Sequence, residues 1–113
     1  NTEGIFNRDA FKRMKPTSIF INTSRGMVHN EADLIEALQN NTIWGAGLDV
    51  TNPEPMLPNN PLLNMENVCV LPHIGSATIE ARNEMARLAA TNIIEYYKNN
   101  NIPNIVNPEV LHN

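Results

Sequence analysis

The sequence is poor in cysteine and in basic charge. Its one cysteine, Cys69, cannot form a disulfide within the chain, and it lies in an apolar run at 68–71. We therefore expect a buried thiol in a reducing compartment. The chain has 8 lysines and arginines against 12 acidic residues, which gives a formal net charge of -4. This balance, without any basic run, argues against nucleic acid as a partner.

Long hydrophobic runs are also missing. No apolar stretch approaches the roughly 20 residues that span a bilayer, and the N-terminus has no signal-like apolar segment. We therefore expect a cytoplasmic protein without a membrane partner. Because the sequence starts at Asn1 rather than at a methionine and enters directly into polar residues, we also expect it to be part of a longer chain.

What the sequence does contain is an alternation of short apolar segments with amphipathic ones. Polar capping residues and prolines mark the boundaries between these segments. The predicted elements, in chain order, are a short helix after Asn7, a strand at 18–22, a helix opened by Asn30 and Asp33, a strand at 44–50, a loop with four prolines at 51–61, a strand at 67–71 and a long helix at 78–99. The tail after Asn100 is expected to be extended.

This order of elements is typical of an α/β fold. Strands that alternate with helices form βαβ units, so we expect a parallel sheet with helices on both faces. Three strands are few for a doubly wound domain, and the helix at 78–99 has an apolar face that so small a sheet would leave uncovered. Gly45, Gly47 and Gly75 lack the spacing that holds a pyrophosphate at a helix N-terminus. Any nucleotide site in this chain is therefore expected to be half a site.

Polar side chains follow each predicted strand. Arg25 comes after the first strand, Asp49 and Glu54 come after the second, and His73 comes after the third. The carboxyl ends of parallel strands meet at one edge of a sheet, and ligands of such sheets bind beyond that edge. The sequence therefore predicts a ligand site in which an arginine, a glutamate and a histidine converge.

These three side chains suit chemistry on an anion. The planar guanidinium of Arg25 can form a paired hydrogen bond to a carboxylate. His73 can give a proton to an oxygen or take one from it. Glu54 would favour the protonated imidazolium and hold the ring in one orientation. Together they describe a general acid with an electrostatic orienting group.

Each residue also has a simpler interpretation. Arg25 in a turn could be a solvated surface charge, and Glu54 between two prolines could be an exposed loop carboxylate. His73 is less ordinary, because it leaves an apolar strand shortly before a glycine and a helix start. His29 and His112 are expected at the surface. With no cysteine or second histidine at ligand spacing, no metal site is predicted.

Three segments stand out for their order along the chain. They are Phe-Ile-Asn-Thr-Ser-Arg-Gly at 20–26, Gly-Leu-Asp-Val at 47–50 followed by Pro-Glu-Pro at 53–55, and Leu-Pro-His-Ile-Gly at 71–75. These motifs resemble the signatures of the D-isomer-specific 2-hydroxyacid dehydrogenases, and three in order are far more specific than any one. Within that family the sequence is most similar to the glyoxylate and hydroxypyruvate reductases.

The resemblance implies a catalytic role for each residue at the predicted edge. Arg25 would hold the substrate's carboxylate and carbonyl, His73 would protonate the forming alkoxide, and Glu54 would orient and charge His73. The reaction would be hydride transfer from NADPH or NADH to a small 2-oxo acid such as glyoxylate or hydroxypyruvate. Only the resemblance favours NADPH over NADH, because the segment that selects between them is not in this chain.

The resemblance also implies binding roles for the neighbouring residues. Asp49 would contact the nicotinamide carboxamide. Thr23 and Gly75 would line the nicotinamide end of the cofactor through backbone groups, with Arg25 beside them. Ser76 would lie near the substrate or cap the following helix.

The same resemblance implies how the chain is divided. Residues 1–76 would be the C-terminal half of a Rossmann-like dinucleotide-binding domain, and residues 77–113 a connecting helix and tail of the substrate domain. The long helix would pack on a substrate domain that this chain lacks, and the full-length protein would be a homodimer. We expect the 113 residues alone neither to bind the dinucleotide tightly nor to turn over substrate.

Two other functions stay open. The same mechanism could serve another D-2-hydroxy acid, such as 3-phosphoglycerate, since substrate choice is set largely by residues outside this chain. The scaffold could also belong to a corepressor-like binding protein without catalysis. The presence of Arg25, Glu54 and His73 together argues against this second alternative.

Overall fold

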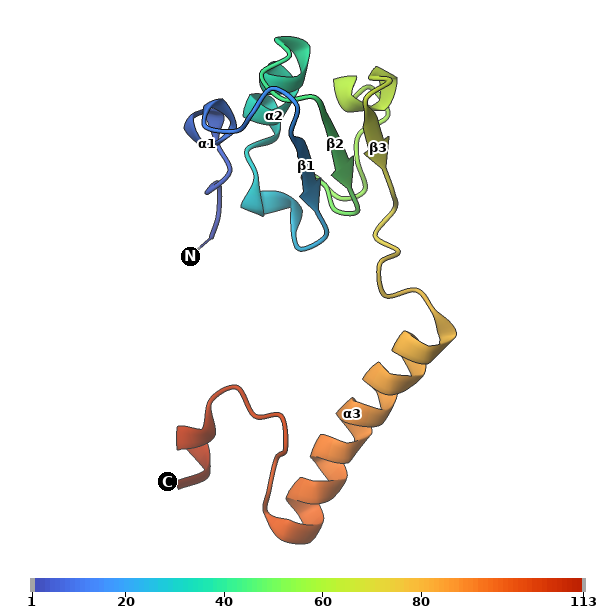
Figure 1. The fold of residues 1–113 in the computed structure, drawn as a ribbon. Coiled ribbons are helices and arrows are strands. Elements are labelled where there is room, and N and C mark those ends of the chain that lie inside the picture. The colour runs from blue at the N-terminus through green and yellow to red at the C-terminus, as the bar shows by residue number, and fades with distance from the viewer. Residues whose placement is uncertain (1, 113) are drawn as a thin grey trace. The chain divides into compact units, whose positions relative to one another are not determined.

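The computed structural model describes residues 2–112, which divide into two compact units with the boundary in the sequence between Gly75 and Ser76. The first unit contains, in chain order, α1 (Arg8–Lys12), β1 (Ile19–Asn22), the 3-10 helix η1 (Gly26–Val28), α2 (Glu31–Gln39), β2 (Gly45–Leu48), the 3-10 helix η2 (Pro61–Asn64) and β3 (Val68–Val70). The second contains α3 (Ile79–Asn99) and the 3-10 helix η3 (Pro108–His112), as Figure 1 shows.

The first unit is built on a parallel sheet of three strands in the order β1-β2-β3. In the register of the sheet, Ile21 is opposite Gly47, and Gly47 is opposite Cys69. The predicted α/β fold with a parallel sheet is therefore confirmed. Because all three strands run the same way, the segments that follow them leave the sheet at one edge.

The core of this unit lies on the face of the sheet that α1 and α2 cover (Figure 1). Phe20 and Asn22 of β1 face inward, as the alternation of a strand requires. Phe11 from α1 packs edge to face on Phe20, with ring centroids 5.2 Å apart, and Leu34 from α2 is fully buried in the same cluster. Burial of each such side chain contributes roughly 1.5–3 kcal/mol.

Within the first unit, residues 2–75, the expectation that helices cover both faces of the sheet is wrong. Ile19 and Ile21 are 51% and 67% exposed on the other face. Cys69, which shares that face, is exposed and not buried as expected. The reason is the strand order, because right-handed connections that add parallel strands in one direction, as those from β1 to β2 and from β2 to β3 do, both lie on the same face of the sheet. Leu62 of η2 packs into the same core as α2 and leaves the opposite face uncovered.

Side-chain caps fix where α1 and α2 begin. The carboxamide oxygen of Asn7 accepts hydrogen bonds from the backbone N–H groups of Asp9 and Ala10, both at 3.1 Å. Asn30 accepts one from the N–H of Asp33 at 3.0 Å. These oxygens satisfy donors that the first turn of a helix leaves without a partner. The helix starts predicted at the two asparagines are confirmed.

The second unit consists of α3 and a tail. Thr78 caps α3 by accepting a hydrogen bond from the N–H of Ala81 at 3.1 Å, and Asn100 ends the helix with a left-handed φ of 49°. No α3 side chain is buried. The tail is not extended throughout, because Pro108 opens η3, as proline readily does in the first turn of a helix. Nowhere in residues 2–112 does a helix combine the length and apolar character needed to cross a bilayer.

Candidate active site

Arg25 is an exposed residue of the turn that follows β1, and Asn22 at the end of that strand holds the turn. The Asn22 carboxamide oxygen accepts hydrogen bonds from the N–H and the hydroxyl of Ser24, at 3.0 and 2.9 Å. Its amino group donates to the Arg25 carbonyl at 3.0 Å. The Arg25 guanidinium donates to the Ser24 carbonyl at 2.7 Å and carries further N–H groups with which to bind an anion.

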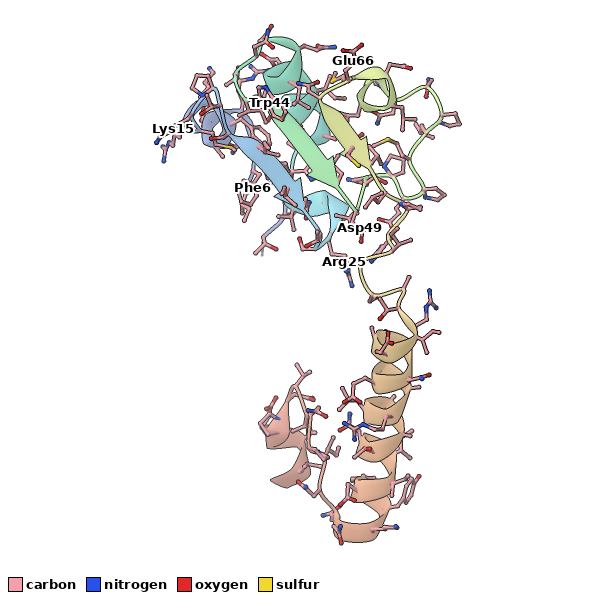
Figure 2. The ribbon with its side chains drawn as sticks, turned by 45° about the vertical axis from the view of Figure 1, so that its right-hand side comes forward. Phe6, Lys15, Arg25, Trp44, Asp49 and Glu66 are labelled. Carbon is pink, nitrogen blue, oxygen red and sulfur yellow. The ribbon has the colours of Figure 1, made fainter. Side chains whose placement is uncertain are left out.

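Figure 2 shows Arg25 and Asp49 at the same end of the sheet, where β1 and β2 finish. The turn at Gly26 packs against the backbone of Thr51, which begins the loop that carries Glu54. The positive charge of Arg25 is close enough to contribute to a lowered pKa at Glu54, after the larger effects of His73 and Thr51. The predicted convergence of residues after the first two strands is therefore seen in the structure.

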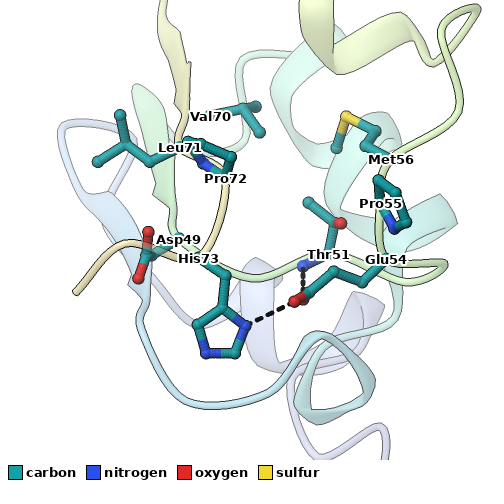
Figure 3. A pocket seen from close by; sticks show the side chains of 9 residues that line it. All are labelled: Asp49, Thr51, Glu54, Pro55, Met56, Val70, Leu71, Pro72 and His73. Carbon is teal, nitrogen blue, oxygen red and sulfur yellow. Dashed lines mark hydrogen bonds and ion pairs between the residues drawn. The ribbon is translucent and has the colours of Figure 1, made fainter. Parts of the chain in front are cut away.

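Glu54 and His73 are hydrogen-bonded to each other on one wall of a pocket (Figure 3). The Nδ1 atom of His73 lies 2.5 Å from Glu54 Oε1, and Glu54 Oε2 accepts a hydrogen bond from the Thr51 N–H at 3.3 Å. These bonds, that of His73 above all, lower the pKa of Glu54. Glu54 is therefore ionised at neutral pH. With Nδ1 engaged by Glu54, Nε2 is the ring nitrogen that can serve a substrate oxygen.

Asp49 fixes the backbone that follows His73. It is only 6% exposed, and its two carboxylate oxygens accept hydrogen bonds from the N–H groups of Ile74 and Gly75, each at 2.8 Å. The Ile74 bond, with the Gly75 bond and the charge of His73, lowers the pKa of Asp49. His73 has a φ of 57°, a conformation that costs a non-glycine residue about 1–3 kcal/mol and persists only where the surroundings impose it. Asp49 supplies that constraint.

The pocket beside the Glu54–His73 pair has a volume of about 540 Å³. Its lining combines four polar side chains with an apolar wall, and consists of Asp49, Thr51, Glu54, Pro55, Met56, Val70, Leu71, Pro72 and His73. A flat, weakly polar ring such as nicotinamide fits this chemistry, since apolar atoms can cover its faces while polar groups lie at the rim. Residues 2–112 contain no group of three or more His, Cys, Asp or Glu placed to hold a metal ion.

The predicted binding residues Thr23, Gly75 and Ser76 have different surroundings in the structure. Thr23 is exposed beside the Arg25 turn. A β-carbon on Gly75 would stand 2.9 Å from Asp49 Oδ2, so the hydrogen bond between these two residues needs a glycine. Ser76 does not cap α3, because Thr78 occupies that position. The contacts of Thr23, Asp49, Gly75 and Ser76 with a cofactor or a substrate stay predictions.

His29 is a buried residue of the first unit. It was expected at the surface, which is wrong, since it is 2% exposed and its ring packs 5.6 Å from that of Phe20. The burial has a non-local cause, because the backbone of Phe6 pairs with that of His29. The importance of Asn22 could have been found, since strand alternation places it on the core face with Phe20. The side chain of His112 lies outside the described part of the chain.

Comparison with known proteins agrees with this geometry. The family model described as D-isomer specific 2-hydroxyacid dehydrogenase, NAD binding domain, matches residues 1–75. The glyoxylate reductase/hydroxypyruvate reductase of Homo sapiens is 55% identical over 93 residues, which cover 82% of this chain and 28% of that protein.

Solved structures are similar as well. The NADPH-dependent glyoxylate/hydroxypyruvate reductase of Sinorhizobium meliloti, in complex with NADP and malonate, has a TM-score of 0.84 at 39% identity and matches 90% of this chain and 32% of its own. D-lactate dehydrogenase from Lactobacillus jensenii, with NAD+, has a TM-score of 0.82 at 29% identity and matches 93% and 36%. The chain therefore spans about a third of the length of these proteins.

Proposed function

Because this chain belongs to the family of D-isomer-specific 2-hydroxyacid dehydrogenases, we propose that the full-length protein reduces 2-oxo acids such as glyoxylate and hydroxypyruvate to D-2-hydroxy acids, with NADPH or NADH. The observation that carries the proposal is the Glu54–His73 pair beside the pocket, at the sheet edge that also bears Arg25. The relatives named as glyoxylate and hydroxypyruvate reductases support the substrate class. The related structures with NADP and with NAD+ support the cofactor class.

In the proposed reaction, this chain binds the anion and supplies the proton. Arg25 holds the substrate carboxylate and polarises the neighbouring carbonyl through its guanidinium N–H groups. When bound, the nicotinamide cofactor supplies a hydride to the carbonyl carbon. His73 donates the proton on Nε2 to the carbonyl oxygen and is left neutral until water returns a proton. Glu54 stabilises the imidazolium form and fixes the ring through Nδ1.

The remaining site residues have binding roles in this proposal. Asp49, Thr23, Gly75 and Arg25 would hold the nicotinamide end of the cofactor, and Ser76 would lie near the substrate. Residues 1–76 would belong to the dinucleotide-binding domain and residues 77–113 to the substrate domain. A homodimer in the cytoplasm completes the proposal, and family resemblance alone supports the dimer.

The test is steady-state kinetics of the full-length protein with Arg25→Lys as the variant. Lysine keeps the positive charge but not the planar pair of donors. We expect the variant to raise the KM for glyoxylate and hydroxypyruvate by about 10-fold or more, with the KM for the dinucleotide little changed. Asp9→Asn, on the exposed surface of α1, is the control variant.

Three outcomes would contradict the proposal. The first is oxidation of 3-phosphoglycerate at a far higher kcat/KM than reduction of glyoxylate or hydroxypyruvate. The second is dinucleotide binding without turnover of any 2-oxo acid, which would indicate a binding protein. The third is an unchanged KM in Arg25→Lys, which would remove Arg25 from the substrate site.

A further inference from the structure

A buried imidazole lies behind the turn that carries Arg25. His29 is 2% exposed and Asn22 is 5% exposed. The Nδ1 atom of His29 lies 2.8 Å from the Nδ2 atom of Asn22. Through the same Nδ2, Asn22 also donates to the carbonyl of Arg25 at 3.0 Å. A buried histidine is thus connected to the backbone of Arg25 through a single carboxamide.

The hydrogen bonds of Asn22 determine which way its carboxamide points. Its oxygen accepts from the backbone N–H of Ser24, which can only donate, and its nitrogen meets the carbonyl of Arg25, which can only accept. The two N–H bonds of Nδ2 are therefore directed at Arg25 and His29. It follows that Nδ1 of His29 accepts a hydrogen bond and that the neutral ring carries its proton on Nε2.

A second proton on His29 would break this arrangement. Protonated Nδ1 is a donor, and it would face the donor of Asn22 at hydrogen-bond distance. Asn22 cannot turn its oxygen toward His29 without losing the bonds to Ser24 and Arg25. The neutral form of His29 is therefore the one that keeps Asn22, and with it the Arg25 turn, in place.

We propose that His29 and Asn22 are positioning residues for Arg25, and that a proton on His29 loosens the turn and weakens binding of the 2-oxo acid. This inference rests on the proposed function, because it takes Arg25 as the substrate-binding group. It adds a control of that binding by proton uptake at a site separate from the Glu54–His73 pair.

The surroundings of His29 set the pH range of this effect. Glu3, from the N-terminal segment, and Glu31, from α2, line with His29 a hollow of about 260 Å³, and their negative charges favour the imidazolium. The ring of Phe20 packs against the His29 ring, and the backbone of Phe6 pairs with that of His29. Neither residue carries a charge. Burial of the ring lowers the pKa of His29. The ring is then neutral at neutral pH and takes up a proton only below the ordinary histidine range, about 6.5.

Two variants of His29 separate positioning from simple packing. In His29→Asn, the side-chain oxygen stands where Nδ1 stood and can accept from Asn22, but it does not titrate. His29→Leu fills the space without an acceptor and leaves a buried N–H of Asn22 unpaired. Kinetics of the full-length protein at neutral pH should show a KM for the 2-oxo acid raised by about 10-fold in His29→Leu and near normal in His29→Asn, with the dinucleotide KM unchanged in both.

The pH dependence of the same KM gives an independent comparison. As the pH falls below about 6.5, the KM of the unaltered protein should rise as His29 takes up a proton, whereas the KM of His29→Asn should lack this rise. This comparison needs no apolar variant, so it stands even if His29→Leu fails to fold. Equal KM profiles for the unaltered protein and His29→Asn would overturn the proposal.

Nuclear magnetic resonance tests the protonation state of His29 and its effect on the Arg25 turn without any assay of activity. In the full-length protein labelled with ¹⁵N-histidine, the signal that His29→Asn removes should show a neutral ring protonated on Nε2 at neutral pH. In a uniformly ¹⁵N-labelled sample, the backbone N–H signals of residues 24–26 should shift together with its titration. A charged ring, or a proton on Nδ1, would overturn the inference whatever the protein catalyses.

The outcomes distinguish this inference from the proposed function. If Arg25→Lys raises the KM for the 2-oxo acid and His29→Leu does not, the positioning role is wrong and the proposed function stands. If neither variant changes that KM while the resonance of His29 behaves as expected, the substrate-binding role of Arg25 is wrong, and control of binding through His29 falls with it.

Discussion

Gly26 lies so close to Thr51 that a β-carbon on Gly26 would stand 2.0 Å from the Thr51 carbonyl oxygen. This approach joins the turn that carries Arg25 to the loop that carries Glu54. Thr51 is itself buried, and its hydroxyl donates to the carbonyl of Pro53 at 2.9 Å. The loop therefore cannot move away from Gly26 without disturbing these contacts. The placement of Arg25 near Glu54 therefore depends on a glycine at position 26.

Gly26→Ala should destabilise the chain by at least about 3 kcal/mol, because the added methyl group overlaps backbone rather than a movable side chain. Chemical unfolding of the 113-residue chain, followed by circular dichroism, measures the change. Gly47→Ala is the matched control, since its β-carbon would meet only Ile21 Cγ1, at an ordinary contact distance of 3.7 Å. Equal stabilities of the two variants would contradict the close approach.

Asp49→Asn should reduce turnover without removing any group that donates a proton. Asparagine keeps one acceptor oxygen but presents an amino group to the second backbone N–H, so one of the bonds to Ile74 and Gly75 is lost. Because these residues follow His73, we expect kcat/KM of the full-length protein to fall between about 10-fold and 10²-fold.

The free energy of unfolding of Asp49→Asn at acidic pH is a second measurement on this variant. The pKa of Asp49 is lowered in the folded chain, so its contribution to stability is present above the unfolded carboxyl range and is lost as the pH falls through the folded value. Asp49→Asn should lack this loss of stability at acidic pH. Asp9→Asn, at an exposed position, should keep it.

Glu54→Gln should change the pH profile of reduction. The pKa of Glu54 is lowered, chiefly by the hydrogen bond with His73, so the carboxylate is charged and favours the imidazolium across the neutral range. Without that charge, the pH above which kcat/KM declines should move down. In the unaltered protein, ionised Glu54 also contributes to the free energy of unfolding, and this contribution is lost as the pH falls below about 4.3. Glu54→Gln should lack this loss of stability. An unchanged profile would show that Glu54 does not act on His73.

The 113 residues on their own should neither bind the dinucleotide tightly nor oxidise NADPH or NADH with glyoxylate. The sequence contains no glycine-rich turn to hold the cofactor's phosphates, so most of the binding energy is absent. The loss of dinucleotide absorbance, with the full-length protein as positive control, measures this. Detectable turnover by the 113-residue chain would refute the expectation.

The features predicted correctly from the sequence have local or topological causes. Asn7 and Asn30 begin helices because a side-chain oxygen satisfies N–H groups only two or three residues away. Glu54 and His73 meet because parallel strands bring the segments after them to one edge, whatever the packing elsewhere.

The features that were missed depend on contacts far apart in the sequence. His29 is buried by the pairing of Phe6 with it, and no periodicity of the segment near His29 indicates this. Cys69 lies in an apolar run, but it is exposed on a face of the sheet that the rest of residues 2–75 leaves uncovered. The backbone bonds of Asp49 to Ile74 and Gly75 were also missed, because the sequence does not show which groups a carboxylate at this end of the sheet will bind.

The central claim is that His73 is the proton donor, and His73→Gln in the full-length protein tests it most directly. Glutamine fills similar space, but it has no proton to transfer at neutral pH. We expect kcat for reduction of the 2-oxo acid to fall by about 10²-fold or more, with the dissociation constant of the dinucleotide little changed. An unaltered kcat in His73→Gln would contradict the account.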